Sequence, residues 1–130
     1  MKILVCEDQD SIRKMIEALV TARGYEVLSA ANGAQALELA QAQVPAVALL
    51  DLTMPGEFDG LEVCRRLRAQ PSTSNIPILI VTALDDEGSR QQARLAGATA
   101  YYTKPFSPIA LLREIERFRT TPTSGETPLG

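Results

Sequence analysis

The chain has 130 residues, of which 45% are hydrophobic, so it is long enough to bury one hydrophobic core and too short for two. Its 13 basic and 16 acidic residues give a net charge of −3, which argues against binding to a nucleic acid or to an anionic membrane. It contains no histidine, the commonest general base and metal ligand, and its two cysteines are too few for a metal cluster. We expect a cytoplasmic domain, because no apolar run approaches the ~18 residues that a bilayer crossing requires and no signal peptide is evident.

The first part of the chain alternates between strand and helix patterns. Residues 3–6 form a short apolar run that predicts a strand, and residues 25–30 predict a second one. A helix begins near Ser11 and stops at Gly24, and Asn32 is placed to cap a second helix. The apolar residues at helical spacing, which we expect to face the core, are Ile12, Met15, Ile16, Leu19 and Val20 in the first helix and Ala36, Leu37 and Ala40 in the second.

The middle of the chain predicts two further strands that are apolar throughout. Residues 47–50 and 78–81 lack polar alternation, as is typical of central parallel strands covered by helices on both faces. Asp59 stands three residues before Glu62 in a variant of the capping box, and this pair opens a helix that ends before Pro71. The residues that we expect this helix to bury are Leu61, Cys64 and Leu67.

The last strand and two helices complete the pattern. A helix over residues 87–96 has Leu95 as its only large apolar residue, so we expect it to be the least firmly docked. Residues 100–103 predict a fifth strand, and Ser107 followed by Pro108 is typical of a helix start. The residues that we expect the final helix to bury are Leu111, Leu112, Ile115 and Phe118.

Five strand–helix pairs in strict alternation predict right-handed crossovers and a parallel sheet between two layers of helices. The fold class is therefore doubly wound α/β, and the common five-stranded solution is the flavodoxin-like strand order 2-1-3-4-5. We expect the domain to span residues 1–119. Residues 120–130 are rich in Thr, Pro and Gly without an apolar period, so we expect a flexible tail or a linker to an absent effector.

Polar side chains stand at the carboxyl ends of four predicted strands. Glu7 and Asp8 follow the first strand, Asp51 the third, Thr82 the fourth and Lys104 the fifth. Three carboxylates at one sheet edge repel one another unless a cation joins them, and oxygen ligands with an incomplete protein shell suit Mg²⁺. We therefore predict a magnesium site that handles a phosphoryl group, with the Lys104 amine and the Thr82 hydroxyl contacting phosphoryl oxygens.

The sequence of these pieces resembles the receiver domain of two-component response regulators. The resemblance rests on the acidic pair at 7–8, the segment DLTMP at 51–55, Thr-Ala at 82–83 and YYTKPF at 101–106. Each segment alone could equally consist of ordinary loop, helix-cap or strand residues. The occurrence of all four in this order at the strand ends is specific to the family.

The resemblance implies that Asp51 is the phospho-acceptor. The phosphoryl group would come from a histidine kinase or a histidine phosphotransfer protein, in trans because this chain has no histidine. The resemblance also implies that Mg²⁺ is held by the carboxylates of Asp8 and Asp51, by the backbone carbonyl of Thr53 and, largely through water, by Glu7. Lys104 would bridge to the phosphoryl group.

The resemblance further implies a switch formed by Thr82 and Tyr101. On phosphorylation the Thr82 hydroxyl would turn towards the phosphoryl group, Tyr101 would rotate inward, and the face made by the fourth helix, fifth strand and fifth helix would change. The Lys104–Pro105 bond would be cis. The output partner and a phosphorylation-dependent homodimer are left open.

The chain departs from the family pattern in the loop between Pro55 and Gly60. This loop is a single residue longer than the commonest spacing, so the positions of Glu57 and Phe58 are not predicted. The family tunes self-dephosphorylation with residues that correspond to Thr53 and Leu84. An apolar Leu84 offers no hydrogen bond to an attacking water, so its effect there would be steric.

Two other classes of protein share this kind of fold. An aspartate-nucleophile phosphatase is the main alternative to a signalling module, but it needs a second aspartate where Thr53 stands. A flavin mononucleotide carrier would place a hydroxyl- and glycine-rich loop after the first strand. Residues 7–10 read EDQD instead, and these acidic side chains would repel the phosphate.

Overall fold

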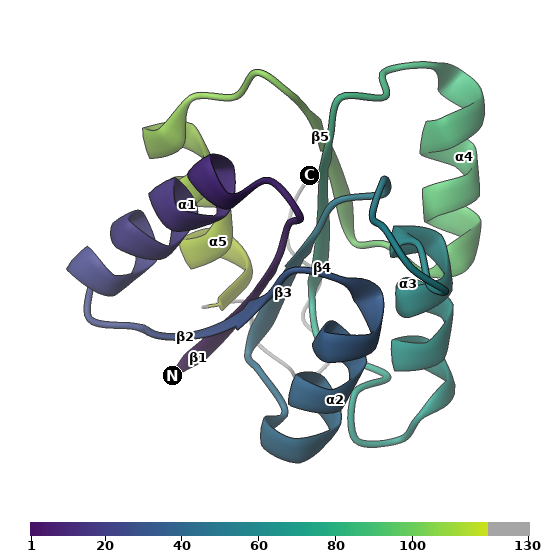
Figure 1. Cartoon of the computed structure of the whole chain (residues 1–130), viewed down its shortest axis with the longest axis horizontal. Coiled ribbons are helices and arrows are strands. Elements are labelled where there is room, and N and C mark those ends of the chain that lie inside the picture. The colour runs from purple at the N-terminus through teal and green to yellow at the C-terminus, as the bar shows by residue number, and fades with distance from the viewer. Residues whose placement is uncertain (120–130) are drawn as a thin grey trace.

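The computed structural model describes residues 1–119 (Figure 1), so the predicted tail at 120–130 lies outside the described residues. Strands and helices alternate without exception. In chain order the elements are β1 (Lys2–Cys6), α1 (Asp10–Ala22), β2 (Glu26–Ala30), α2 (Gly33–Gln43), β3 (Val47–Leu50), α3 (Gly60–Ala69), β4 (Ile78–Thr82), α4 (Glu87–Ala96), β5 (Ala100–Thr103) and α5 (Pro108–Arg119).

All five strands form one parallel sheet in the order β2-β1-β3-β4-β5. Helices α1 and α5 cover one face of the sheet, and α2, α3 and α4 cover the other (Figure 1). The predicted fold class and strand order are therefore confirmed. None of the helices within residues 1–119 is both long enough and apolar enough to cross a membrane.

The core consists of two apolar layers separated by the sheet. Along β1, Leu4 and Cys6 pack into the layer under α2, α3 and α4, whereas Ile3 and Val5 pack into the layer under α1 and α5. Strand β4 divides its side chains in the same way. Because each central strand is covered on both faces, every position in it favours an apolar residue, which explains the runs without polar alternation.

Three predicted helix starts are confirmed by their caps. The cap side chain accepts a hydrogen bond from the N–H three residues on: Asn32 from Gln35 at 2.9 Å, Asp59 from Glu62 at 2.9 Å, and Ser107 from Ala110 at 3.3 Å. Only this half of the predicted capping box at Asp59 is present, because the Glu62 carboxylate pairs with Arg65 and Arg66 further along α3.

Five of the residues that were expected to face the core are not fully buried. Met15 is exposed, and four others are only partly buried: Ile12, Leu19, Leu61 and Phe118. Val63 takes the buried place expected for Leu61. Leu95 is 80% exposed, because α4 turns Ala93 and Ala96 towards the sheet and position 95 falls on the opposite side of the helix. Helix α4 thus docks through small side chains rather than through a large apolar anchor.

The side chain of Arg68 ties three segments together. Its guanidinium donates hydrogen bonds to the backbone oxygens of Ser74 at 3.1 Å, Ile76 at 2.6 Å and Gly97 at 2.9 Å, and to the Thr99 hydroxyl at 3.3 Å. Burial lowers the pKa of Arg68. Gly97, the C-cap of α4, has φ +106°, and a Cβ there would lie 2.6 Å from the Arg68 Cγ. The end of α3, the loop after it and the end of α4 are therefore joined at one charged group.

We expect Gly60→Ala to lower the free energy of unfolding by about 2 kcal/mol or more, because overpacking against backbone cannot be relieved by a side-chain movement. A Cβ at position 60 would lie 2.2 Å from the Asp51 carbonyl oxygen and 2.7 Å from the Leu52 Cα. Urea denaturation followed by circular dichroism measures the change. The matched control is Gly88→Ala on the exposed surface of α4, which should stay within about 0.5 kcal/mol of the wild type. Equal losses in the two variants would contradict the prediction.

We expect both cysteines to be unreactive in the folded protein. Cys6 and Cys64 are free thiols with 2% and 0% exposure, and burial raises the pKa of Cys6 to about 12. Burial raises the pKa of Cys64 as well, so both thiols stay protonated at pH 8. A colorimetric thiol reagent should therefore detect no fast reaction in buffer and two thiols in urea. Rapid labelling of either cysteine in the native protein would contradict this expectation.

Candidate functional site

The sheet register brings the strand-end residues to one edge. The backbone ladder continues one residue past three strands: the Glu7 N–H donates to the Ala30 carbonyl at 3.1 Å, the Asp51 N–H to Cys6 at 3.1 Å, and the Lys104 N–H to Thr82 at 2.8 Å. Each site residue is thus held by its backbone before its side chain makes any contact. The three side chains therefore start at the same level along the strand direction.

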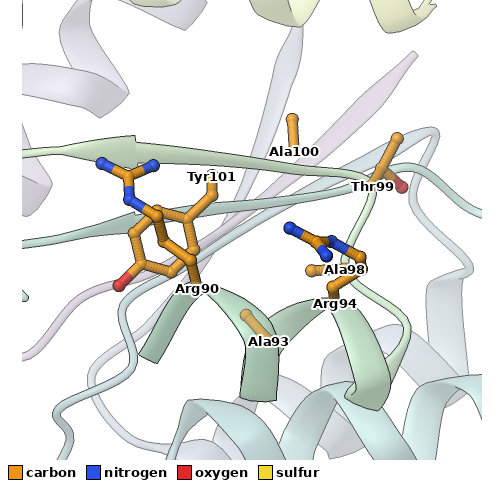
Figure 2. A pocket seen from close by; sticks show the side chains of 7 residues that line it. All are labelled: Arg90, Ala93, Arg94, Ala98, Thr99, Ala100 and Tyr101. Atoms are coloured by element: carbon orange, nitrogen blue, oxygen red, sulfur yellow. The ribbon is translucent and has the colours of Figure 1, made fainter. Parts of the chain in front are cut away.

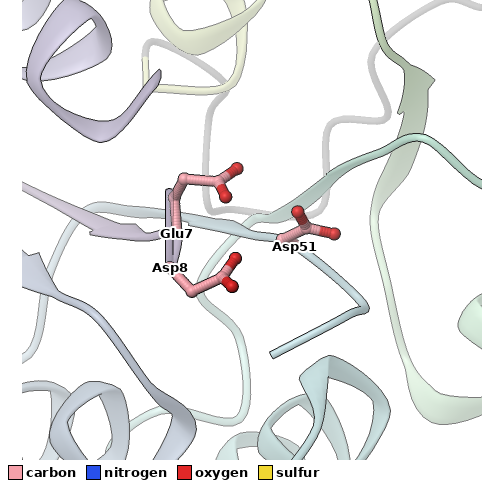
Figure 3. Close-up of side chains that lie close together, drawn as sticks. All are labelled: Glu7, Asp8 and Asp51. Carbon is pink, nitrogen blue, oxygen red and sulfur yellow. The ribbon is translucent and has the colours of Figure 1, made fainter. Parts of the chain in front are cut away.

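The carboxylates of Glu7, Asp8 and Asp51 form a cluster (Figure 3). One oxygen from each lies within 4.8 Å of the others. Glu7 and Asp51 are buried, with 3% and 6% exposure, whereas Asp8 is exposed. The cluster therefore combines two carboxylates that are shielded from water with one that faces it.

Lys104 lies between the two buried carboxylates. Its Nζ donates to Glu7 Oε1 at 2.6 Å and to Asp51 Oδ2 at 2.8 Å. Burial raises the pKa of Glu7, against the opposing effect of its hydrogen bonds. Burial alone would lower the pKa of Lys104, but the hydrogen bonds to Asp51 and Glu7 prevail and raise it. The two directions are compatible, because Glu7 shares the single ammonium group with a second carboxylate.

Backbone groups hold the remaining carboxylate oxygens. The Thr53 N–H donates to Asp51 Oδ1 at 3.1 Å, and the Gln9 N–H donates to Glu7 Oε2 at 3.1 Å. The Arg13 guanidinium donates to the Glu7 carbonyl at 2.8 Å. Gln9, Arg13 and the Thr53 N–H were not predicted from the sequence, because a main-chain donor has no signature in residue type and Arg13 binds a backbone oxygen.

Gly60 is a further site residue that was not predicted from the sequence. Its N–H donates to the Leu52 carbonyl at 3.0 Å, and the start of α3 lies directly against the backbone of Asp51. The glycine next to the capping residue Asp59 was the available signal. Its lack of a side chain lets α3 approach the loop that carries Asp51.

The loop with the extra residue packs against the start of α2. Phe58 is partly buried, with the Arg66 guanidinium 4.2 Å from its ring centroid. A Cβ on Gly33 would lie 2.5 Å from the Phe58 carbonyl oxygen and 2.8 Å from its Cβ. Glu57 is exposed. The loop therefore packs against α2 through Phe58, and the contact between Asp51 and Thr53 is retained in the site.

Thr82 and Tyr101 lie beside the cluster rather than in it. Thr82 is buried, and its hydroxyl accepts a hydrogen bond from the Leu84 N–H at 3.4 Å. The Tyr101 hydroxyl donates to the Leu84 carbonyl at 2.6 Å. The Lys104–Pro105 peptide bond is cis. Among the residues predicted for the site, the structure thus brings Glu7, Asp8, Asp51 and Lys104 together, with Thr82 and Tyr101 linked to each other through Leu84.

The donor set of the cluster fits a magnesium ion. The three carboxylates carry three formal negative charges, and Lys104 offsets one of them, so a dication would complete the neutralisation. Asp8 makes no hydrogen bond or ion pair to another side chain within residues 1–119, which leaves its oxygens available. Oxygen-only ligands on the solvent side of a buried pair suit an ion that keeps several of its waters.

A parallel sheet with three carboxylates and a lysine gathered at the carboxyl ends of its strands defines a doubly wound α/β protein with an acidic site at the usual ligand-binding edge. The model of the response regulator receiver domain family matches residues 3–116. The chain therefore belongs to this family, whose members are signalling modules of two-component systems and bind Mg²⁺ at an acidic pocket.

The chain is similar to several curated proteins. It is 40% identical to response regulator PleD of Caulobacter vibrioides over 91% of this chain and 26% of that protein. It is 42% identical to the probable transcriptional regulator ycf27 of Cyanophora paradoxa over 96% of this chain and 54% of that protein. The chain thus spans between about a quarter and a half of the length of these relatives.

Solved structures show the same fold. The chemotaxis protein CheY4 of Vibrio cholerae superposes with a TM-score of 0.84 at 35% identity, covering 90% of this chain and 97% of that one. The receiver domain of the sensor histidine kinase PA1611 from Pseudomonas aeruginosa PAO1 has a TM-score of 0.85 at 33% identity, covering 92% and 98%. That structure has a magnesium ion coordinated in its active-site cleft.

We expect Lys104→Met to destabilise the protein by about 2 to 3 kcal/mol at pH 7.5 without divalent metal. The variant leaves two buried carboxylates without their cation, and the 15% exposure of Lys104 places the loss below that of a fully buried pair. Burial raises the pKa of Glu7, so protonation relieves the penalty as the pH falls. The difference from wild type should therefore shrink at pH 5 in urea denaturation. The control Lys14→Met, on the exposed side of α1, should have a free energy of unfolding close to that of wild type at both pH values. A loss of stability in Lys104→Met that does not change with pH would contradict the prediction.

Proposed function

We propose that Asp51 accepts a phosphoryl group from a phosphohistidine of a separate histidine kinase or phosphotransfer protein, and that this modification switches the domain between two signalling states. The observation that carries the proposal is the pairing of the Lys104 ammonium with both buried carboxylates at the carboxyl ends of the strands. Membership of the receiver family and the lack of any histidine in the chain support transfer in trans.

The chemistry is a phosphoryl transfer from nitrogen to oxygen. A carboxylate oxygen of Asp51 attacks phosphorus and forms a P–O bond while the P–N bond breaks, and the imidazole leaves with the electron pair and takes a proton from water. Hydrogen bonds from Lys104 and from the Thr53 N–H fix the Asp51 carboxylate before the donor arrives. Lys104 then stabilises the negative charge on the phosphoryl oxygens.

Mg²⁺ would be held by Asp8, by Asp51 and by the Thr53 carbonyl, with Glu7 contributing largely through water. When bound, the ion supplies positive charge to the phosphoryl oxygens and so lowers the repulsion between the donor and the acidic cluster. Glu7 is the ligand most tightly held by the protein itself, because its oxygens accept from Lys104 and from the Gln9 N–H.

Thr82 and Tyr101 form the switch of this proposal. The Thr82 hydroxyl is hydrogen-bonded to Leu84 in this structure, and its rotation towards the phosphoryl group would break that bond. Tyr101 holds the carbonyl of the same residue, so a movement of Leu84 reaches its ring. The face of α4, β5 and α5 then changes, and self-dephosphorylation by water returns the domain to its first state. Leu84, whose side chain is apolar and exposed, would affect that water only by its bulk.

We expect acetyl phosphate with Mg²⁺ to add one phosphoryl group to the protein, located at Asp51 by intact mass and peptide mapping. The Asp51→Asn variant should show no adduct, because the amide is a poor nucleophile, and a chelator should suppress the reaction in wild type. The matched control is Asp85→Asn in the exposed loop after β4, which should be phosphorylated as wild type is.

An adduct on another residue, or an adduct of equal yield in Asp51→Asn, would overturn the assignment of the acceptor. Steady turnover of phosphate monoesters without an accumulating adduct would favour the phosphatase alternative instead.

A further inference from the structure

The side chain of Arg13 connects the first turn of α1 to the backbone of the acidic loop after β1. Its guanidinium donates to the Glu7 carbonyl at 2.8 Å and to the Asp10 carboxylate, and its Nε lies 3.5 Å from Glu17 Oε2. The side chain is only 13% exposed. A long charged side chain is therefore held among three oxygen acceptors, directly beside the loop that carries Asp8.

The Glu7 carbonyl depends on such a donor. Strand β1 ends at Cys6, so this carbonyl lies beyond the sheet ladder, and Glu7 is 3% exposed. A buried backbone carbonyl without a donor is unfavourable, so the guanidinium stabilises the peptide orientation seen here. That peptide joins Glu7 to Asp8, and its orientation determines where the Asp8 side chain begins.

The three carboxylates of the cluster lie together (Figure 3), but Asp8 is held differently from the other two. Glu7 and Asp51 each accept from Lys104 and from a backbone N–H. The Asp8 side chain is exposed, and within residues 1–119 no hydrogen bond or ion pair to another side chain holds it. Its position relative to Asp51 therefore depends on the backbone of the acidic loop.

We propose that Arg13 is a positioning residue for the magnesium site, which holds the Glu7 carbonyl and thereby keeps the Asp8 carboxylate beside Asp51. The inference rests on the proposed function, in which Asp8 and Asp51 both hold Mg²⁺. The guanidinium is itself positive, so its direct electrostatic effect on a nearby dication is repulsive. Positioning and charge thus predict opposite results when the guanidinium is removed: positioning predicts weaker binding of Mg²⁺, and charge alone predicts tighter binding.

The test is the affinity of the metal-free protein for Mg²⁺ without a phosphodonor, measured from the amide shifts of Asp8 and Thr53 in ¹H–¹⁵N NMR titrations. Arg13→Met keeps an apolar stem and removes the guanidinium. It should raise the dissociation constant about tenfold, the lower end of the effect of losing a group that orients metal ligands. The reference for the loss of a ligand is Asp8→Asn, which should bind Mg²⁺ more weakly than wild type.

Two controls remove a positive charge without touching the acidic loop. Lys14→Met acts on the exposed side of α1. Arg94→Met acts in the pocket between α4 and β5, where Figure 2 shows Arg90 over the ring of Tyr101 at one end. Arg94 lies at the other end beside Thr99, which precedes β5, so it is at the sheet edge opposite the cluster. Both controls should bind Mg²⁺ within about twofold of wild type, because salt screens exposed charges.

Urea midpoints separate positioning from a general loss of stability. A ligand that binds the folded state raises the midpoint according to its dissociation constant, so the rise caused by Mg²⁺ reports the affinity even in a less stable variant. At the same Mg²⁺ concentration, this rise should be smaller in Arg13→Met than in wild type.

A rise that is unchanged or larger in Arg13→Met, or a dissociation constant that is unchanged or lower, would overturn the inference while leaving the proposed function intact. A loss of affinity in either control as large as that in Arg13→Met would overturn it as well. Failure of the wild type to bind Mg²⁺, or wild-type affinity in Asp8→Asn, would instead count against the metal site of the proposed function.

Discussion

The ammonium group of Lys104 lies between two carboxylates that burial has largely separated from water. Removing either charge partner from such a pair leaves the other unpaired in a medium that solvates it poorly, so the three groups constrain one another. Lys104 comes from the last strand and Glu7 from the first, and Asp51 lies between them in space. The pairing therefore also ties the fifth strand–helix unit to the first across the top of the sheet.

This pairing depends in turn on the parallel register of the sheet. The backbone hydrogen bonds of Glu7, Asp51 and Lys104 continue the ladder beyond the regular strands, so the three side chains start from the same edge. Gly60 also contributes to the position of Asp51, because α3 can approach the Asp51 backbone only where there is no Cβ. The main-chain geometry therefore brings the acidic residues together, and the side-chain contacts then fix the positions of the carboxylates.

The strands and the residues at their ends could be predicted because they follow from periodicity along the chain, whereas the strand order was expected only because it is the common solution for five strand–helix pairs. Periodicity did not reveal which side of a short helix faces the sheet when alanines compete with a single large residue, as in α4, where Ala93 is buried and Leu95 is exposed. The main-chain donors at Gln9 and Thr53 carry no signal in residue type. The stacking of Arg90 on Tyr101 joins two elements whose separation only tertiary structure determines.

The hydrogen bonds of Arg68 give α4 two unlike ends. At its carboxyl end, Gly97 is fastened to α3 through a charged group whose partners are all neutral oxygens, so neither phosphoryl chemistry nor protonation of the acidic cluster alters that attachment. At its amino end the helix begins three residues after Leu84, which contacts both Thr82 and Tyr101. Because α4 is held at its carboxyl end, a displacement that began at Leu84 would be greatest around the first turn of the helix and would decrease towards Gly97.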